Sequence, residues 1–172
     1  MKQTSSLWQW LGFGVATLGG TILHFLYDWT GSVWVAPFSG VNESVWEHMK
    51  LLFWPLFLFA LVQRLFFREQ ENFWRVKLWS ILLGLLLIPV LFYTYNGAIG
   101  KSPDWLNIAL FYICAGLVFL FEHRAFGTVC QPCRFSFAAL WLLGALFVVF
   151  TFAPPRIPLF QDPLTNLYGL GQ

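Results

Sequence analysis

The sequence predicts an all-α integral membrane protein, a bundle of five transmembrane helices followed by a proline-rich extracytoplasmic C-terminal tail. Of its 172 residues, 58% are hydrophobic and only 10% are charged, against roughly 25% charged residues in soluble domains. The apolar residues gather in runs of about twenty, the length that a helix needs to cross a hydrocarbon core about 30 Å thick. These runs leave no room for a soluble domain, so residues 1–172 are expected to form a single multi-pass membrane domain.

The five helices are expected in the order in which the apolar runs occur. They cover about 7–27, 46–67, 74–96, 104–123 and 135–153, and the tail takes residues 154–172. The first run follows Lys2 and is too long for the apolar core of a secretory signal, so it is expected to remain as an anchoring helix. Four prolines break the tail, which therefore cannot be another spanning helix. The tail is expected to fold back along the outer membrane surface, with its leucines and Phe160 in apolar surroundings above the site.

The basic residues predict which ends of the helices face the cytoplasm. Lysine and arginine gather in short cytoplasmic loops, and one side of the predicted topology carries seven of them. These are Lys2, Arg64, Arg68, Arg75, Lys77, Arg124 and Arg134, whereas the other side has Lys50, Lys101 and Arg156. The protein is therefore expected in the plasma or inner membrane, with its N-terminus in the cytoplasm and its C-terminus outside.

One face of the first predicted helix changes from small to ionisable residues along its length. Gly12, Ala16 and Gly20 recur every four residues, which places them on one face. His24 and Asp28 continue this spacing in the stretch "TILHFLYDW". Small residues let a second helix approach closely, so His24 is expected to face a protein neighbour. Asp28 has a second interpretation, as a residue that ends the helix at the lipid headgroups.

The second predicted helix begins with charged residues in the stretch "VNESVWEHMKLLFWP". Glu43 and Glu47 share a helix face, and His48 lies about 100° around from Glu47. Two antiparallel helices would bring these side chains to the depth of His24, because both stretches fall at the outer face. Ser44 to Glu47 also matches the S-x-x-E capping box, so Glu47 is either a helix cap or a site residue.

These imidazole and carboxylate groups are sufficient to bind a divalent metal such as zinc. The expected metal ligands are His24, His48, Glu43 and Asp28. The expected catalytic bases are Glu47 and Glu43, which would act on a metal-bound water and a membrane-accessible substrate. The E-x-x-x-E-H spacing is not that of zinc proteases, so neither a hydrolase nor any other reaction is specified. Two further functions stay open, a cation or proton transporter and a structural or accessory membrane subunit.

Composition also limits the partners. A formal charge of +2 without a basic stripe argues against nucleic acid. The expected partners are membrane lipids, and a homo-oligomer or a partner membrane protein stays open.

Cys130 and Cys133 form a C-x-x-C pair, which we interpret as incidental or weakly metal-binding, with thiol–disulfide exchange as the alternative. Asp162, just before Pro163, fits a helix cap better than a site residue.

Three blocks of the sequence resemble a family of small bacterial multi-pass membrane proteins of uncharacterised function. The blocks are "HFLYDW", "VNESVWEHMKLLFWP" and "PPRIPLFQDPLTNLYG". The resemblance extends across nearly the whole chain and implies the multi-pass architecture and the grouping of the three blocks. It implies no activity, substrate or cofactor.

Overall fold

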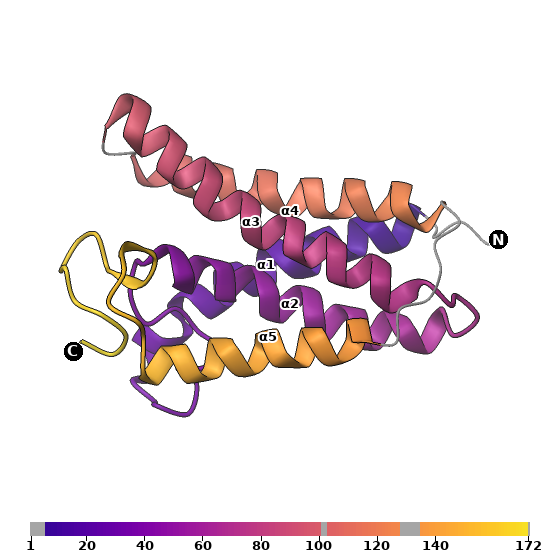
Figure 1. Ribbon diagram of the computed structural model, residues 1–172, viewed down its shortest axis with the longest axis horizontal. Helices are drawn as coiled ribbons and strands as arrows, with labels where there is room; N and C mark the ends of the chain where they lie inside the picture. Colours follow the sequence, from indigo (N-terminus) through magenta and orange to yellow (C-terminus); the bar gives the residue numbers. More distant parts are fainter. Residues whose placement is uncertain (1–5, 101–102, 128–134, 172) are drawn as a thin grey trace.

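The computed structural model describes residues 6–100, 103–127 and 135–171 (Figure 1). Its helices are α1 (Ser6–Thr30), α2 (Val45–Phe66), α3 (Phe73–Ile99), α4 (Asp104–Phe126) and α5 (Phe135–Phe152), followed by the short 3-10 helix η1 (Pro158–Phe160). Within the described residues, five helices are long and apolar enough to cross a membrane. The all-helical fold and the number of long helices are therefore confirmed, with bounds that differ from the predicted ones by a few residues.

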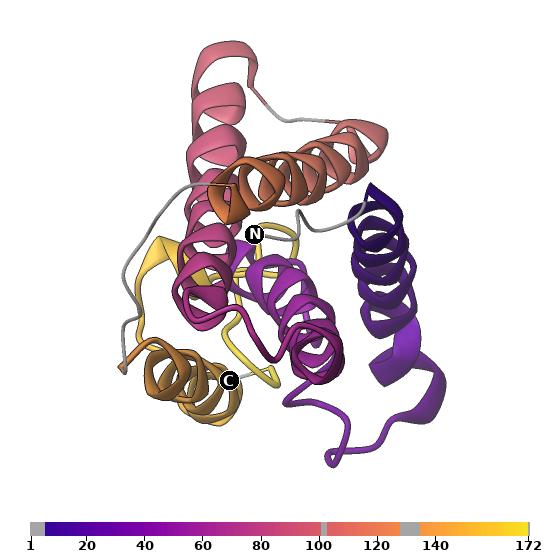
Figure 2. The same ribbon diagram turned by 90° about the vertical axis from the view of Figure 1, so that its right-hand side faces the viewer.

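The helix α2 is the central element, and α1, α3, α4 and α5 surround it (Figure 2). In α2, 61% of the most apolar stretch is buried, against 22–39% in the other four long helices. Apolar composition does not explain this position, because the mean hydropathy of α2, 1.5, is below the 2.1 and 2.2 of α3 and α5.

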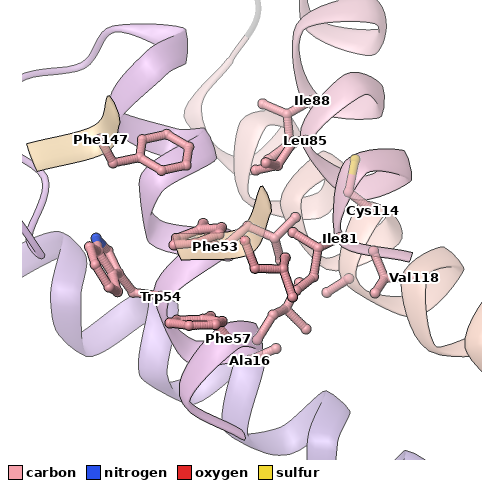
Figure 3. Close-up of a cluster of buried hydrophobic side chains, with 14 of the residues drawn as sticks. Ala16, Phe53, Trp54, Phe57, Ile81, Leu85, Ile88, Cys114, Val118 and Phe147 are labelled. Carbon is pink, nitrogen blue, oxygen red and sulfur yellow. The ribbon is translucent and has the colours of Figure 1, made fainter. Parts of the chain in front are cut away.

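Aromatic and aliphatic side chains fill the space around α2 (Figure 3). The rings of Phe53 and Phe57 are stacked with 5.5 Å between their centroids, and Phe147 of α5 lies 5.0 Å from Phe53. Ile81 and Leu85 of α3 belong to the same buried cluster. This core holds α3 and α5 against α2 and leaves the polar residues at the two ends of the bundle.

The predicted small-residue face of α1 is confirmed as a helix contact. Gly12, Ala16 and Gly20 are buried. A Cβ atom on Gly12 would lie 2.3 Å from the ring of Phe119 in α4, and one on Gly20 would lie 2.6 Å from the ring of Phe111. Only residues without a side chain allow α1 and α4 to approach this closely.

The two ends of the bundle differ. At one end, which we call the tail end, α1 finishes, α2 begins and residues 153–171 fold (left in Figure 1). At the opposite end α2 finishes and α3 begins. Lys77, which counts toward the predicted cytoplasmic charge, lies there in the second turn of α3. Lys77 is buried and donates to Glu122 of α4 at 2.6 Å, so it is a core residue and not a loop cation.

Candidate functional site

The loop between α1 and α2 is fastened to α1 at the turn that carries His24. The Ser39 hydroxyl donates to the Leu23 carbonyl and accepts from the Tyr27 N–H at 2.8 Å. A regular α-helix joins these two backbone groups directly, so the hydroxyl is inserted into the hydrogen-bond ladder of α1. The Gly40 N–H also donates to the Leu23 carbonyl, at 3.1 Å. As a result the loop lies directly against His24.

We expect Ser39→Ala to lower the free energy of unfolding by about 1–3 kcal/mol, because the Leu23 carbonyl and the Tyr27 N–H lose their shared partner. Denaturant unfolding in detergent micelles measures this change. Ser32→Ala, in the same loop, is the matched control and is expected to have little effect. Equal effects of the two substitutions would contradict the role of the Ser39 hydroxyl.

The start of α2 fixes Glu43 between two anchored residues. Ser44 is the N-cap of α2, and its hydroxyl accepts from the Glu47 N–H at 3.4 Å. Asn42 accepts from the Ser44 N–H at 2.9 Å through its side-chain oxygen, and its side-chain nitrogen donates to the Gly169 carbonyl at 2.9 Å. Glu43 therefore projects from a segment that is tied to both α2 and the C-terminal segment.

The carboxylate of Glu43 lies between two imidazole rings. Its Oε1 is 3.7 Å from Nε2 of His24, and its Oε2 is 3.6 Å from Nε2 of His48. The centroids of the two rings are 5.7 Å apart. These three side chains are 27–42% exposed, so they form a partly open cluster at the tail end. The sequence predicts this grouping of His24, Glu43 and His48, and the structure brings the three side chains together.

The hydrogen bond made by His48 determines which ring nitrogen carries its proton. Nδ1 of His48 lies 2.9 Å from the Ser44 carbonyl, and a carbonyl oxygen can only accept. Nδ1 therefore bears the hydrogen, and in the neutral ring Nε2 presents a lone pair toward Glu43. This is the arrangement found for metal-binding histidines, whose second nitrogen usually donates to a carbonyl or a carboxylate.

A small cavity of about 50 Å³ opens beside this cluster, with room for a few water molecules. Asp28, an exposed residue near the end of α1, lies on its wall. The cavity is lined by His24, Asp28, Gly40, Val41, Asn42 and Glu43. Within the described part of the chain, no three His, Cys, Asp or Glu side chains form a ready-made metal site.

Glu47 lies apart from the histidines, in a buried network around Lys50. Its Oε2 accepts from the Val41 N–H at 3.1 Å and lies 2.5 Å from Nζ of Lys50. Lys50 also donates to the Ala36 carbonyl at 2.8 Å and to the Thr151 hydroxyl at 3.0 Å. All three N–H groups of the ammonium are thus used. The serine half of the predicted capping box is present, because Ser44 caps α2. The Glu47 side chain does not complete the box, because the Ser44 N–H donates to Asn42 and the Glu47 carboxylate binds the Val41 N–H and Lys50 instead.

Sequence reasoning missed the role of Lys50, which it treated only as a basic residue near the outer face. The available signal was its spacing, since Lys50 follows Glu47 by three positions and enters an uninterrupted apolar run. Residues three apart lie on the same side of a helix, and a lysine beside apolar residues needs a partner.

The C-terminal segment packs on the start of α2 and does not line the cavity. The ring of Phe160 lies 4.6 Å from that of Trp46, which confirms the apolar surroundings predicted for Phe160. Leu164 and Leu167 are exposed on the molecular surface. Asp162 accepts from the Leu164 N–H at 2.8 Å and from the Thr165 hydroxyl at 2.7 Å, so it holds a turn, and residues 163–171 contain no helix of the kind that the predicted cap requires. Its hydrogen bond to the site runs from Asn42 to the Gly169 carbonyl of the segment.

Several residues used in the sequence analysis lie outside the described residues. They are Lys2, Lys101, Cys130, Cys133 and Arg134. The interpretation of the cysteine pair therefore stays a prediction.

The five long apolar helices, with ionisable side chains at their ends, are characteristic of a multi-pass membrane protein. A family model matches residues 1–170, and the chain belongs to that family, a family of unknown function (DUF6512). This result agrees with the resemblance to an uncharacterised family. No curated protein and no solved structure matches the chain.

Proposed function

We propose that His24, Glu43 and His48 form a divalent-metal centre at the outer boundary of a membrane, where a metal-bound water acts on a membrane-accessible substrate. The observation that carries this proposal is the position of Glu43, whose two carboxylate oxygens each face an imidazole Nε2 at 3.6–3.7 Å. A separation of this size is too long for a hydrogen bond. It leaves one carboxylate and two imidazole nitrogens facing one another with no hydrogen bond between them.

The spacing of these donors supports a bound cation. A zinc ion held at about 2.0–2.2 Å by each ligand keeps neighbouring ligand atoms roughly 3.3–3.5 Å apart in a tetrahedral site. The two nitrogen–oxygen separations are a few tenths of an ångström longer. Small side-chain rotations would close this difference, since all three side chains are partly exposed. Two imidazoles and one carboxylate leave a coordination position for water, as in catalytic zinc sites.

Asp28 is the remaining carboxylate on the cavity wall. In this proposal Asp28 would serve as the general base, while His24, His48 and Glu43 would hold a metal able to activate a water molecule. Glu47, the other base expected from the sequence, is held by Lys50 and by the Val41 N–H. Its part is to fix the loop that carries Glu43.

The surroundings of the cluster support a substrate that comes from the membrane. Trp29 is 68% exposed and Trp34 is 90% exposed, and both lie in or beside the loop that carries the site. Exposed tryptophans are typical of the boundary between lipid and water. The ring of Phe25 lies beside both His24 and Trp29, with its centroid 4.8 Å and 5.9 Å from theirs.

The distribution of basic residues supports an outer position for the tail end. Lys50 and Lys77 are buried in ion pairs, so they do not belong to the loop lysines and arginines whose distribution predicts the orientation. The remaining basic residues by sequence position are Lys2, Arg64, Arg68, Arg75, Arg124 and Arg134 toward the opposite end, and Lys101 and Arg156 toward the tail end. The asymmetry persists, and it favours an extracytoplasmic site and C-terminus.

The middle of α2 favours a one-sided site over a transport pathway. Lys50 and Gln63 are the nearest buried polar residues on either side of its apolar run. They are separated by roughly 20 Å along the helix, at about 1.5 Å per residue. A pathway for ions requires polar groups or water along such a distance.

Metal analysis of the purified protein tests this proposal. The wild-type protein, prepared without added metal and analysed by plasma mass spectrometry, is expected to contain a stoichiometric divalent metal. His24→Ala and Glu43→Gln are expected to lose it, because each removes one of three ligands. His123→Ala alters a histidine near the opposite end of the bundle and is expected to retain the metal.

A wild-type protein without stoichiometric metal, which also takes up none from a zinc-containing buffer, would exclude a metal centre. If His123→Ala lost the metal while His24→Ala kept its full metal content, the metal would bind outside the cluster of His24, Glu43 and His48. Circular dichroism and gel filtration of each variant separate the loss of a ligand from the loss of the fold.

A further inference from the structure

The opposite end of the bundle contains a buried ion pair between α3 and α4. Nζ of Lys77 donates to Oε1 of Glu122 at 2.6 Å, and the two side chains are 3% and 1% exposed. The ring centroids of Phe59, Phe73 and Phe126 lie 5.6–5.9 Å from the ammonium. Two ionised groups in such apolar surroundings are costly unless further polar groups solvate them.

Helix geometry brings two glutamines to the level of this pair. A Cβ atom on Gly12 would lie within 2.3–2.7 Å of the rings of Phe59 and Phe119, so α1, α2 and α4 meet at this point. Residues three or four positions apart share a helix face. One turn nearer to the opposite end, these three faces carry Gln9, Gln63 and Glu122. Together with Lys77 they form what we call the polar layer.

The amides of both glutamines lack hydrogen-bond partners within the described residues. The side-chain oxygen and nitrogen of Gln63 and of Gln9 are all shielded from solvent, and none bonds to another described group. Gln63 is fully buried. Buried amides in folded proteins are almost always paired, with protein or with ordered water. Two such side chains on neighbouring helices therefore indicate polar partners that the described side chains do not supply.

We propose that the polar layer binds a small cluster of internal water molecules. The layer offers one cation, one anion and two amide groups. Each amide both donates and accepts hydrogen bonds. A free cation would be repelled by Lys77 and a free anion by Glu122, whereas water satisfies both kinds of group. Internal waters typically make about three hydrogen bonds to buried polar groups. The cluster joins Gln9 to Gln63 and solvates the ion pair, independently of the proposed metal centre.

A double-mutant cycle tests whether the two glutamines share water. Gln9→Met and Gln63→Met keep the side-chain size but remove the amide, and thermal unfolding of each single variant and of the double variant is compared. Shared water predicts that each single change lowers Tm and that the double variant loses less than the sum of the two. An increase in Tm in either single variant, or additive effects, would overturn the proposal.

A second measurement on the wild-type protein does not depend on how the variants fold. Solid-state NMR in lipid bilayers, with glutamine side chains labelled with ¹⁵N, is expected to show magnetisation transfer from water to the amides of Gln9 and Gln63. Gln161, which lies in the C-terminal segment, is the internal control for contact with solvent. Transfer to Gln161 without transfer to the two buried glutamines would overturn the proposal.

Discussion

Lys50→Met is expected to lower the free energy of unfolding by about 3–5 kcal/mol, the usual cost of breaking a buried ion pair by removing one partner. The substitution leaves the carboxylate of Glu47 buried without its counter-ion, and it also removes the donor to the Ala36 carbonyl and the Thr151 hydroxyl. Methionine keeps the length of the side chain, so little of the change comes from packing. Denaturant unfolding in detergent micelles measures it.

Two further variants identify the cause of this loss. Glu47→Gln/Lys50→Met removes both charges and is expected to recover part of the stability, because no unpaired charge stays buried. Arg156→Met alters an exposed cation of the C-terminal segment and is expected to change stability little. A Lys50→Met protein as stable as Arg156→Met would show that the buried network does not hold the loop to α2 and α5.

Gly12→Ile is expected to be the most disruptive change on α1. Its Cβ atom alone would lie 2.3 Å from Phe119 and 2.7 Å from Phe59, so α1 must move away from α2 and α4. Overpacking of this kind typically costs about 1–3 kcal/mol and occasionally more. The free energy of unfolding in detergent micelles is again the measurement.

Gly14→Ile is the matched control for this substitution. A Cβ atom on Gly14 would meet no atom within 4 Å, while the change in helix propensity is the same at both positions. The difference between the two variants therefore isolates the helix contact. Equal destabilisation by the two would mean that propensity, and not packing, explains the loss.

The helices could be predicted from the sequence because their cause is local. Each apolar run is long enough by itself to indicate a spanning helix, and the bounds move by only a few residues in the structure. The grouping of His24, Glu43 and His48 could also be predicted, since the residues lie at the ends of two consecutive helices that a short loop connects.

The remaining contacts depend on residues that are distant in the sequence. Lys77 pairs with Glu122, Lys50 with Thr151, and Asn42 with Gly169. No periodic pattern connects such positions, because each contact is set by the way the helices pack. This is also why spacing alone could not show the role of Glu47. The S-x-x-E pattern predicts a capping box, but the loop places the Val41 N–H and Lys50 at its carboxylate instead.

The insertion of Ser39 into α1 has a consequence for the order in which the protein is made. The last turns of α1 depend on a hydroxyl that the ribosome supplies only after the helix itself. The contacts that the loop makes with the turn around His24 can therefore form only after residues 39 and 40 have been added to the chain. All three residues of the cluster lie between positions 24 and 48. The first helical hairpin can thus assemble the cluster during synthesis, before α3, α4 and α5 exist, and the later arrival of Thr151 and Gly169 secures it.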